Sequence, residues 1–246
     1  MTWLIRQQEA DLQDFHPEFK HAIDALMEVI PNAEVGSFRL SGEIIDEMPT
    51  NAAQKMRPYQ EAIVTCFAIP ITEDSLWIWH KHGENRSLMA NYILGLAAKS
   101  IIDRLAALDN IKVEEITALV EQELSMVRLG ELAGLGRRGW NNLLIHPEWG
   151  AWLQIHAVIG YMSAPLASEL SSDVCIHCGN CIRACPVKAV KPNLFNPVAC
   201  SSVVAAPTRR KSKAIALTEN SYIECRECIK SCPIGSEPEE IFEWKH

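Results

Sequence analysis

Cysteine spacing constrains this chain more than any other feature, because eight of its nine cysteines fall after residue 174 in two runs and the stretch between them. The first run has the pattern C-x2-C-x2-C-x3-C-P and comprises Cys175, Cys178, Cys181 and Cys185. Two-residue spacers let three thiolates surround one face of an iron–sulfur cubane, and the three-residue spacer carries the fourth thiolate to another cluster. The run therefore predicts a 4Fe-4S site.

A second run, Cys225, Cys228 and Cys232, has the pattern C-x2-C-x3-C-P and lacks the first of the usual four cysteines. Cys200 lies between the two runs and can supply the missing ligand. Two-cluster ferredoxins exchange the fourth cysteine of each run. This exchange predicts a first cysteine group of Cys175, Cys178, Cys181 and Cys232, and a second cysteine group of Cys185, Cys200, Cys225 and Cys228.

Zinc is the main alternative for paired C-x2-C motifs. Tetrahedral zinc, however, takes four ligands from two such pairs and leaves the third cysteines and the Cys-Pro ends unexplained. One 4Fe-4S cluster beside a three-iron or empty second site is a further alternative. The ninth cysteine, Cys66, lies in the apolar run of residues 62–69 and is interpreted as a small core side chain in a buried strand.

The overall charge and hydropathy favour an ordinary globular protein. The chain has 246 residues, 23 Lys and Arg against 31 Asp and Glu, and a net charge of −8, which argues against a main task of gripping a phosphate backbone. The N-terminus turns polar after Ile5, so no signal peptide is expected. The longest apolar stretch, residues 88–108, contains too many polar groups to cross a bilayer. We therefore expect a cytoplasmic protein without a membrane partner, whose cysteines are not paired as disulfides.

The hydrophobic pattern divides the chain into two predicted domains, giving an α+β fold class. Residues 1–165 carry enough periodic apolar residues for their own core, and residues 166–246 are turn-rich and depend on clusters for order. Helical spacing predicts helices over residues 19–30 and 88–108, and either a helix or a loop over residues 116–127. Residues 143–145, 147–150 and 151–159 predict a hairpin of strand, turn and strand.

Two histidine-containing segments are candidate sites. In the second strand of the predicted hairpin, one face is aliphatic and belongs in the core, and the other is mixed and contains His156. The mixed face either lines a pocket or meets water, and solvent is the simpler interpretation for His156 alone. His80 and His82 could pair on a metal, but a polar loop before a helix explains them more simply.

Gly134, Gly136 and Gly139 match G-x-G-x-x-G, but their surroundings do not support a dinucleotide site. That fingerprint requires a preceding strand, a helix that opens from the loop and an acidic residue about twenty positions later. Here the preceding segment has a helical pattern, and the region around residue 159 holds no carboxylate. Two interpretations stay open: the glycines turn the chain, or their bare backbone approaches a large flat or phosphate-bearing cofactor.

Residues 132–145, the Pro-Glu-Trp-Gly sequence at 147–150 and the cysteine runs together resemble epoxyqueuosine reductases and their relatives, the reductive dehalogenases. The resemblance covers roughly residues 120–235. It implies an N-terminal nitroreductase-like domain that holds cobalamin, followed by a ferredoxin-like domain whose two 4Fe-4S clusters reduce it. It also implies that the glycine loop, with Trp140 and Asn141 beside it, contacts the cofactor.

The chain departs from the family's pattern at two positions. Trp140 replaces the usual Lys, and Val120 stands where the family has an Asp proton donor. The remaining weak candidates for a proton donor are Glu121, Glu123, His156 and Tyr161.

Basic and terminal segments bear on the partners. Arg137, Arg138 and residues 209–213 could touch an anionic ligand or a redox partner, although solvated loop charge is the simpler account. Family members often carry a C-terminal helical-repeat extension that helps hold tRNA, and this chain stops at His246. Together with the acidic charge, this makes tRNA a disfavoured partner.

Two classes of function follow. The first is an iron–sulfur oxidoreductase in which electrons from a ferredoxin or flavodoxin pass through two 4Fe-4S clusters to a cobalamin that reduces a small organic substrate. The second is an electron-transfer or corrinoid-handling protein without its own substrate turnover. We favour the enzyme, because an electron carrier has little use for some 165 residues of separate α+β domain.

Overall fold

The computed structural model describes residues 33–71, 74–82, 85–109, 113–115, 125–161, 164, 166–170, 172–192, 194–204, 215–218 and 220–235. The predicted helix over residues 19–30, most of the helix or loop over residues 116–127, and the candidates Glu121 and Glu123 lie outside these residues.

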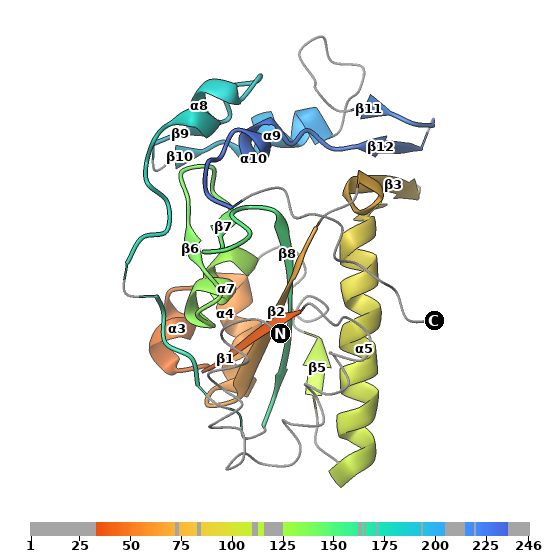
Figure 1. Ribbon diagram of the computed structural model, residues 1–246. Coiled ribbons are helices and arrows are strands. Elements are labelled where there is room, and N and C mark those ends of the chain that lie inside the picture. Colours follow the sequence, from red (N-terminus) through yellow and green to blue (C-terminus); the bar gives the residue numbers. More distant parts are fainter. Residues whose placement is uncertain are drawn as a thin grey trace.

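An antiparallel sheet with strand order β1-β2-β8-β5 lies at the centre of the molecule (Figure 1). Its strands are β1 (Glu34–Arg39), β2 (Ile63–Pro70), β8 (Leu153–Gly160) and β5 (Val113–Glu115). Every residue of β2 is buried, which explains its unbroken apolar sequence, since a strand covered on both faces needs no polar side. The expectation that Cys66 lies in a buried strand is confirmed.

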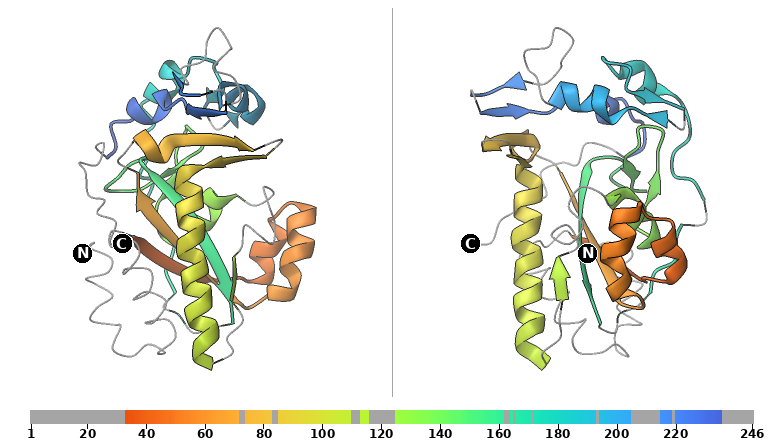
Figure 2. Two further views of the ribbon diagram at one scale, coloured as in Figure 1. Left: turned by 90° about the vertical axis from the view of Figure 1, so that its right-hand side faces the viewer. Right: turned by 180° about the vertical axis from the view of Figure 1, so that it is seen from behind.

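Helices cover both faces of this sheet (Figure 2). One face packs against the long helix α5 (Met89–Asp109). The other packs against α3 (Gly42–Asp46), α4 (Thr50–Met56) and α7 (Met126–Leu132). On α5 the buried residues recur three and four positions apart, as one face of a helix requires: Leu94, Ala97, Ala98 and Ile101. The helix predicted over residues 88–108 is therefore confirmed.

Strand β8 is buried on both sides. Its predicted aliphatic face lies in the core, where Ile155 and Ala157 pack beneath α7. The opposite face is also covered, since Val158 packs among residues of α5. His156 on that face is only 5% exposed, and its ring centroid lies 5.7 Å from that of Phe67. The solvent interpretation of His156 is wrong, because a second helical layer covers the side that alternation alone left open.

The predicted hairpin of residues 143–159 is wrong in its pairing. Strand β7 (Leu144–Ile145) pairs with β6 (Arg137–Arg138), whereas β8 pairs with β2 and β5. An isolated bridge between His146 and Gly150 closes the intervening turn. The strands were visible in the sequence, but their partners are chosen by tertiary packing.

A second sheet joins segments that lie far apart in the sequence. Its order is β11 (Ile215–Ala216), β12 (Ser221–Ile223), β3 (Ile78–His82) and β4 (Asn85–Leu88), so a strand from the cysteine-rich segment pairs with one that precedes α5. The polar loop expected around His80 and His82 is therefore wrong, because these residues belong to β3. A short helical turn, η3 (Asp74–Trp77), leads into β3, and another, η2 (Arg57–Tyr59), leads out of α4.

The cysteine-rich segment lies beyond this second sheet, at one end of the molecule (Figure 1). It contains α8 (Asn180–Ala184), the small hairpin of β9 (Val190–Lys191) and β10 (Leu194–Phe195), α9 (Pro197–Val204) and α10 (Glu227–Lys230). The mixture of helices and strands that the sequence predicts is confirmed. Within the described ranges, none of the helices combines the length and the apolar character that a membrane span needs.

Candidate functional site

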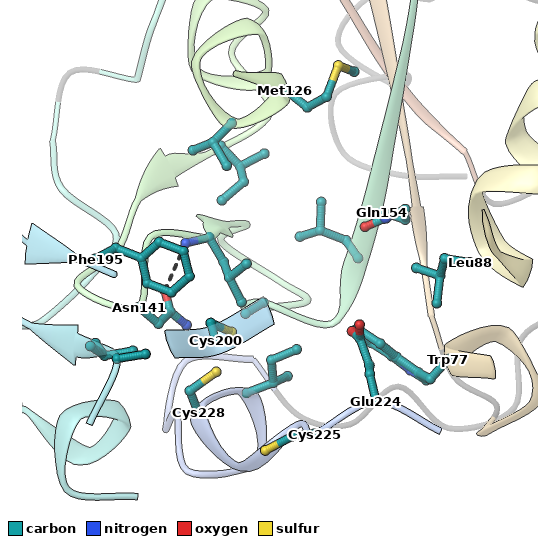
Figure 3. A pocket seen from close by; sticks show the side chains of 18 of the residues that line it. Trp77, Leu88, Met126, Asn141, Gln154, Phe195, Cys200, Glu224, Cys225 and Cys228 are labelled. Atoms are coloured by element: carbon teal, nitrogen blue, oxygen red, sulfur yellow. Dashed lines mark hydrogen bonds between the residues drawn. The ribbon is translucent and has the colours of Figure 1, made fainter. Parts of the chain in front are cut away.

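A cavity of about 580 Å³ lies between the central sheet and the cysteine-rich segment (Figure 3). Its walls come from β3, α5, α7, β8 and the helices and loops that carry the cysteines, and they are mainly apolar and aromatic. Trp77, Trp79, Leu143, Ile155 and Phe195 are among the lining residues. A cavity of this size and character is typical of small-molecule and cofactor sites, which span about 300–1,000 Å³.

The second cysteine group lines this same cavity: Cys185, Cys200, Cys225 and Cys228. Figure 3 shows the labelled thiols along the wall that α9 and α10 form. The fold therefore brings a cysteine that follows α8 together with three from segments farther along the chain. Their placement puts all four sulfur atoms beside the space in which a ligand would sit.

The first cysteine group lines a smaller, separate cavity: Cys175, Cys178, Cys181 and Cys232. Trp140 and His177 also line it, and their rings stack with centroids 4.9 Å apart and planes inclined by 29°. The structure thus gathers the eight cysteines into two sets with the membership that the exchange of fourth cysteines predicts. That these sets hold iron stays a prediction.

The thiols in each set influence one another electrostatically. Burial raises the pKa of Cys228, and the charges of Cys200 and Cys225 raise it further. Burial also raises the pKa of Cys200 to about 11. In the first group, burial raises the pKa of Cys181, and the charge of Cys175 adds to this. Several thiolates in such surroundings need a cationic centre to remain ionised at neutral pH, because metal coordination deprotonates a thiol.

The arrangement of the cysteines does not by itself choose between zinc and clusters. Among the residues that the structure describes, no three His, Cys, Asp or Glu side chains converge closely enough to hold a single metal ion. The cysteines of each set line a cavity, and which metal centre each set holds stays a prediction.

Glu224 places a carboxyl group in the wall of the large cavity, directly before Cys225. Its Oε2 atom accepts a hydrogen bond of 2.6 Å from Trp79 Nε1. Burial raises the pKa of Glu224 to about 7, although this hydrogen bond and the charge of Arg226 act in the opposite direction. Sequence reasoning missed Glu224; its position next to a predicted ligand was the available signal.

Further polar groups in the cavity wall can recognise a ligand. Gln154 Nε2 donates a hydrogen bond of 2.7 Å to Asn91 Oδ1, and both residues line the cavity. Trp77 is 3% exposed, and its indole N–H is buried without an acceptor in the described structure. These residues come from three separate elements. Gln154 lies on the mixed face that the sequence offered as a possible pocket lining, whereas Trp77 and Asn91 were missed, because neither belongs to a local motif.

The residues predicted to contact a cofactor lie in different places. Asn141 lines the large cavity, and its Oδ1 atom accepts a hydrogen bond of 3.2 Å from the Leu143 backbone. Gly134, Gly136 and Gly139 are not among its lining residues in the described structure. A Cβ atom on Gly136 would stand 2.5 Å from the carbonyl oxygen of Ile145 in β7, so this glycine lets two backbones approach. Gly134 has a φ of +72°, which agrees with the chain-turning interpretation, and cofactor contact by the glycines stays a prediction.

The predicted proton donors also separate. His156 lines the large cavity, and it does so within a buried strand. Tyr161 is 58% exposed and donates a hydrogen bond of 2.7 Å to the Pro58 carbonyl oxygen. Tyr161 is not among the lining residues, which weakens its candidacy.

Comparison with known proteins first defines the class. The 4Fe-4S binding domain family matches residues 169–191, which include all four cysteines of the first run. Epoxyqueuosine reductase of Listeria monocytogenes is 32% identical over 131 residues, covering 50% of this chain and 34% of that enzyme. The corresponding enzyme of a Synechococcus strain is 40% identical over 60 residues, covering 24% of this chain and 18% of that enzyme.

Solved structures show the same relationship at the level of the fold. Epoxyqueuosine reductase of Bacillus subtilis superposes with a TM-score of 0.65 at 15% identity, over 92% of this chain and 67% of that one. An epoxyqueuosine reductase structure with a modified tRNA stem loop superposes with a TM-score of 0.63 at 16% identity, over 88% of this chain and 64% of that one. A catabolic reductive dehalogenase superposes with a TM-score of 0.56 at 14% identity, over 82% of this chain and 30% of that one.

These findings define an iron–sulfur protein with a mixed α/β fold and a ferredoxin-like segment. The chain resembles epoxyqueuosine reductases in sequence, and it shares the fold of those enzymes and of reductive dehalogenases. The sequence match to the Listeria enzyme spans about a third of that enzyme's length.

Proposed function

We propose that this chain is an iron–sulfur reductase in which two 4Fe-4S clusters pass low-potential electrons to a cobalamin in the large cavity. One observation carries the proposal: the second cysteine group and an apolar, aromatic wall line the same cavity. In this proposal residues 1–165 form the cofactor domain, related to nitroreductases. Residues 166–246 form the ferredoxin-like domain with both clusters.

The residues present fit a corrinoid. A corrin ring has broad apolar faces and a rim of amide groups, and the cavity offers apolar walls with primary amides at Asn91, Asn141 and Gln154. The buried indole N–H of Trp77 can donate to an amide oxygen of the rim, which would give this orphaned donor an acceptor. When bound, cobalamin supplies a cobalt centre that takes up electrons and reduces a substrate.

The chain's own residues have separate tasks in this proposal. The second cysteine group holds the cluster that lies beside the cavity. The first group holds the other cluster, which lies farther from the substrate. The buried walls exclude water from the reaction space, which protects a low-potential centre. Of the candidate proton donors that the structure describes, His156 is the one in the cavity wall.

The decisive experiment is anaerobic reconstitution followed by titration with cob(II)alamin, monitored by absorbance and electron paramagnetic resonance. About eight irons per chain are expected for two 4Fe-4S clusters. A stoichiometric change to the spectrum of cobalamin without its lower base is expected on titration. Intact clusters without cobalamin binding would overturn the corrinoid part of the proposal and leave an iron–sulfur carrier or a reductase with another cofactor.

Two substrate classes can then be compared. A small organic molecule is the first class, because the walls of the cavity are mainly apolar. The epoxyqueuosine reductase structure with a modified tRNA stem loop supports the second class, so such a stem loop is tested beside small epoxides and organohalides. Turnover of the stem loop would show that the sequence-based argument against a tRNA substrate is wrong. Electron transfer to a partner without turnover of either class would support the electron-transfer or corrinoid-handling alternative.

A further inference from the structure

The cysteine-rich segment is basic although the whole chain is acidic. Residues 174–235 contain nine Lys and Arg against three Asp and Glu, a net charge of +6, whereas the full chain carries −8. In the described part of this segment, the exposed basic residues are Arg183, Lys188, Lys191 and Lys230. Helices α8 and α10 pack against each other, and β9 follows α8 closely, so these side chains belong to neighbouring elements. In the part of the chain that the structure describes, the cysteine-bearing end of the molecule thus exposes four positive side chains.

The first cysteine group reaches the surface at this end. Cys178 is exposed, and the neighbouring Ile176 is 62% exposed. Leu194 in β10 is 61% exposed, and it pairs across the hairpin with Lys191. Exposed apolar side chains beside charged ones are typical of the centre and rim of an interface.

A hollow of about 600 Å³ adjoins the first cysteine group. Trp140 and His177 line both this hollow and the cavity of the first cysteine group, so the stacked pair forms the partition between them. Arg138 lines the hollow as well, and its guanidinium donates to the neutral side-chain oxygens of Asn142 and Ser125, both at 3.3 Å.

The acidic side chains around the hollow compensate only part of its positive charge. Glu131 is 9% exposed, and its carboxylate accepts a hydrogen bond of 2.8 Å from the Arg138 backbone. Asp173 is exposed at the edge of the hollow and opposes the arginines there. Arg137 donates to Glu169 at 2.6 Å, so its charge is compensated. The basic rim of the hollow is then Arg138 in its lining and Lys191, which pairs with the lining residue Leu194, and these two attract a partner.

We propose that this hollow and its basic rim are the docking face for a small acidic electron-donor protein. The inference rests on the proposed function, because it assigns an entry point to electrons that the clusters then carry. On docking, the donor is oxidised by one electron and the cluster of the first cysteine group is reduced by one. Opposite charges would speed the encounter, and the exposed apolar residues would bury against the donor around its redox centre.

Rapid mixing with flavodoxin hydroquinone, or with a reduced 2[4Fe-4S] ferredoxin, tests this face on the reconstituted full chain. Bleaching of cluster absorbance gives the second-order rate constant. The charge reversals Arg138→Glu and Lys191→Glu together should lower that constant about tenfold or more at low salt, with a smaller loss for the two Gln substitutions. High salt should remove most of the difference. Lys55→Glu, an exposed residue of α4, is the matched control and should leave the rate unchanged.

The outcomes separate this inference from the proposed function. Dithionite should reduce the wild-type protein and all variants equally; clusters that are missing or not reducible would defeat the proposed function and the docking face with it. Intact clusters, with donor rates that the charge reversals leave unchanged for both proteins, would overturn the docking face alone. Loss of binding to a tRNA stem loop in the same variants, with donor rates unchanged, would assign the basic rim to nucleic acid instead.

Discussion

Gly150 lies directly against the backbone of Ile234, since a Cβ atom on Gly150 would stand 1.8 Å from the Ile234 carbonyl oxygen. Gly150 belongs to the turn before β8 and has a φ of +59°, a conformation that favours glycine. Ile234 follows Cys232 and Pro233 in the chain. This contact therefore seats the last member of the first cysteine group against the central sheet.

Gly150→Ala should consequently damage both stability and the first cluster. Overpacking and the unfavourable φ together should lower the free energy of unfolding by about 2 kcal/mol or more, as measured by urea denaturation. Iron content should fall because Cys232 is displaced. Gly95→Ala is the matched control: no atom lies within 4 Å of its added Cβ, and alanine within a helix should raise stability by about 0.5–1 kcal/mol. Equal unfolding free energies and iron contents in the two variants would refute the role of this contact.

Cys200→Ser should remove one cluster and spare the other. Cys200 lines the large cavity with the rest of the second group, so iron should drop from about eight to about four per chain. The remaining cluster should keep its electron paramagnetic resonance signal. Cys66→Ala, a buried residue of the sheet, should retain all the iron. Full iron content in the Cys200 variant would rule out the assignment of this cysteine as a ligand.

Trp77→Phe should weaken corrinoid binding with a limited effect on folding. The substitution removes an N–H that is buried without an acceptor in the described structure, so the unliganded protein loses no hydrogen bond. A lost hydrogen bond to the ligand should raise the Kd of cob(II)alamin about tenfold, or roughly 1.4 kcal/mol.

Trp152→Phe provides the control for Trp77, because the two rings meet edge to face with centroids 6.1 Å apart and Trp152 is not among the lining residues. Its substitution should change thermal stability and leave corrinoid affinity alone. The proposed role of the Trp77 N–H fails if both variants bind cobalamin as the wild type does.

Glu169 should make stability depend on pH. Burial alone would raise the pKa of this carboxyl, but the hydrogen bonds and charges of Arg128 and Arg137 outweigh it and lower the pKa. Because the folded pKa lies below the unfolded value of about 4.3, the ionised carboxylate stabilises the fold above that pH, and this stability is lost as pH falls through the folded pKa.

Glu169→Gln should therefore cost about 1 kcal/mol of unfolding free energy at pH 7, and the difference from wild type should vanish in strong acid. Urea denaturation at several pH values measures both. Glu61→Gln is the control, because Glu61 is 59% exposed and lies 3.9 Å from Arg39, so its loss should cost almost nothing. A penalty for Glu169→Gln that persists in strong acid would contradict the electrostatic explanation.

Part of the structure could be predicted from the spacing of residues along the sequence. The cysteine sets could be predicted because spacers of two and three residues limit which thiols can meet. Helix α5 could be predicted because its buried residues repeat over many turns. Each cysteine run and the helix pattern are contained within a short stretch of chain, and the exchange between the runs follows the pattern of two-cluster ferredoxins.

Features that arise from contacts between distant segments could not be read in this way. The burial of His156 depends on a second helical layer, and the pairing of β7 depends on the approach that Gly136 permits. Trp77, Asn91 and Gln154 meet in one cavity wall although they come from η3, α5 and β8. No single window of sequence contains that wall.

The pairing of β12 with β3 has a consequence for biogenesis. Trp79 and Glu224 are hydrogen-bonded although 145 residues separate them in the chain. During synthesis β3 emerges from the ribosome long before β12, and pairing over such a separation is a late and slow step of folding. The wall that carries the second cysteine group is complete only after that step, so we expect iron delivery to this wall to follow the pairing of β12 with β3.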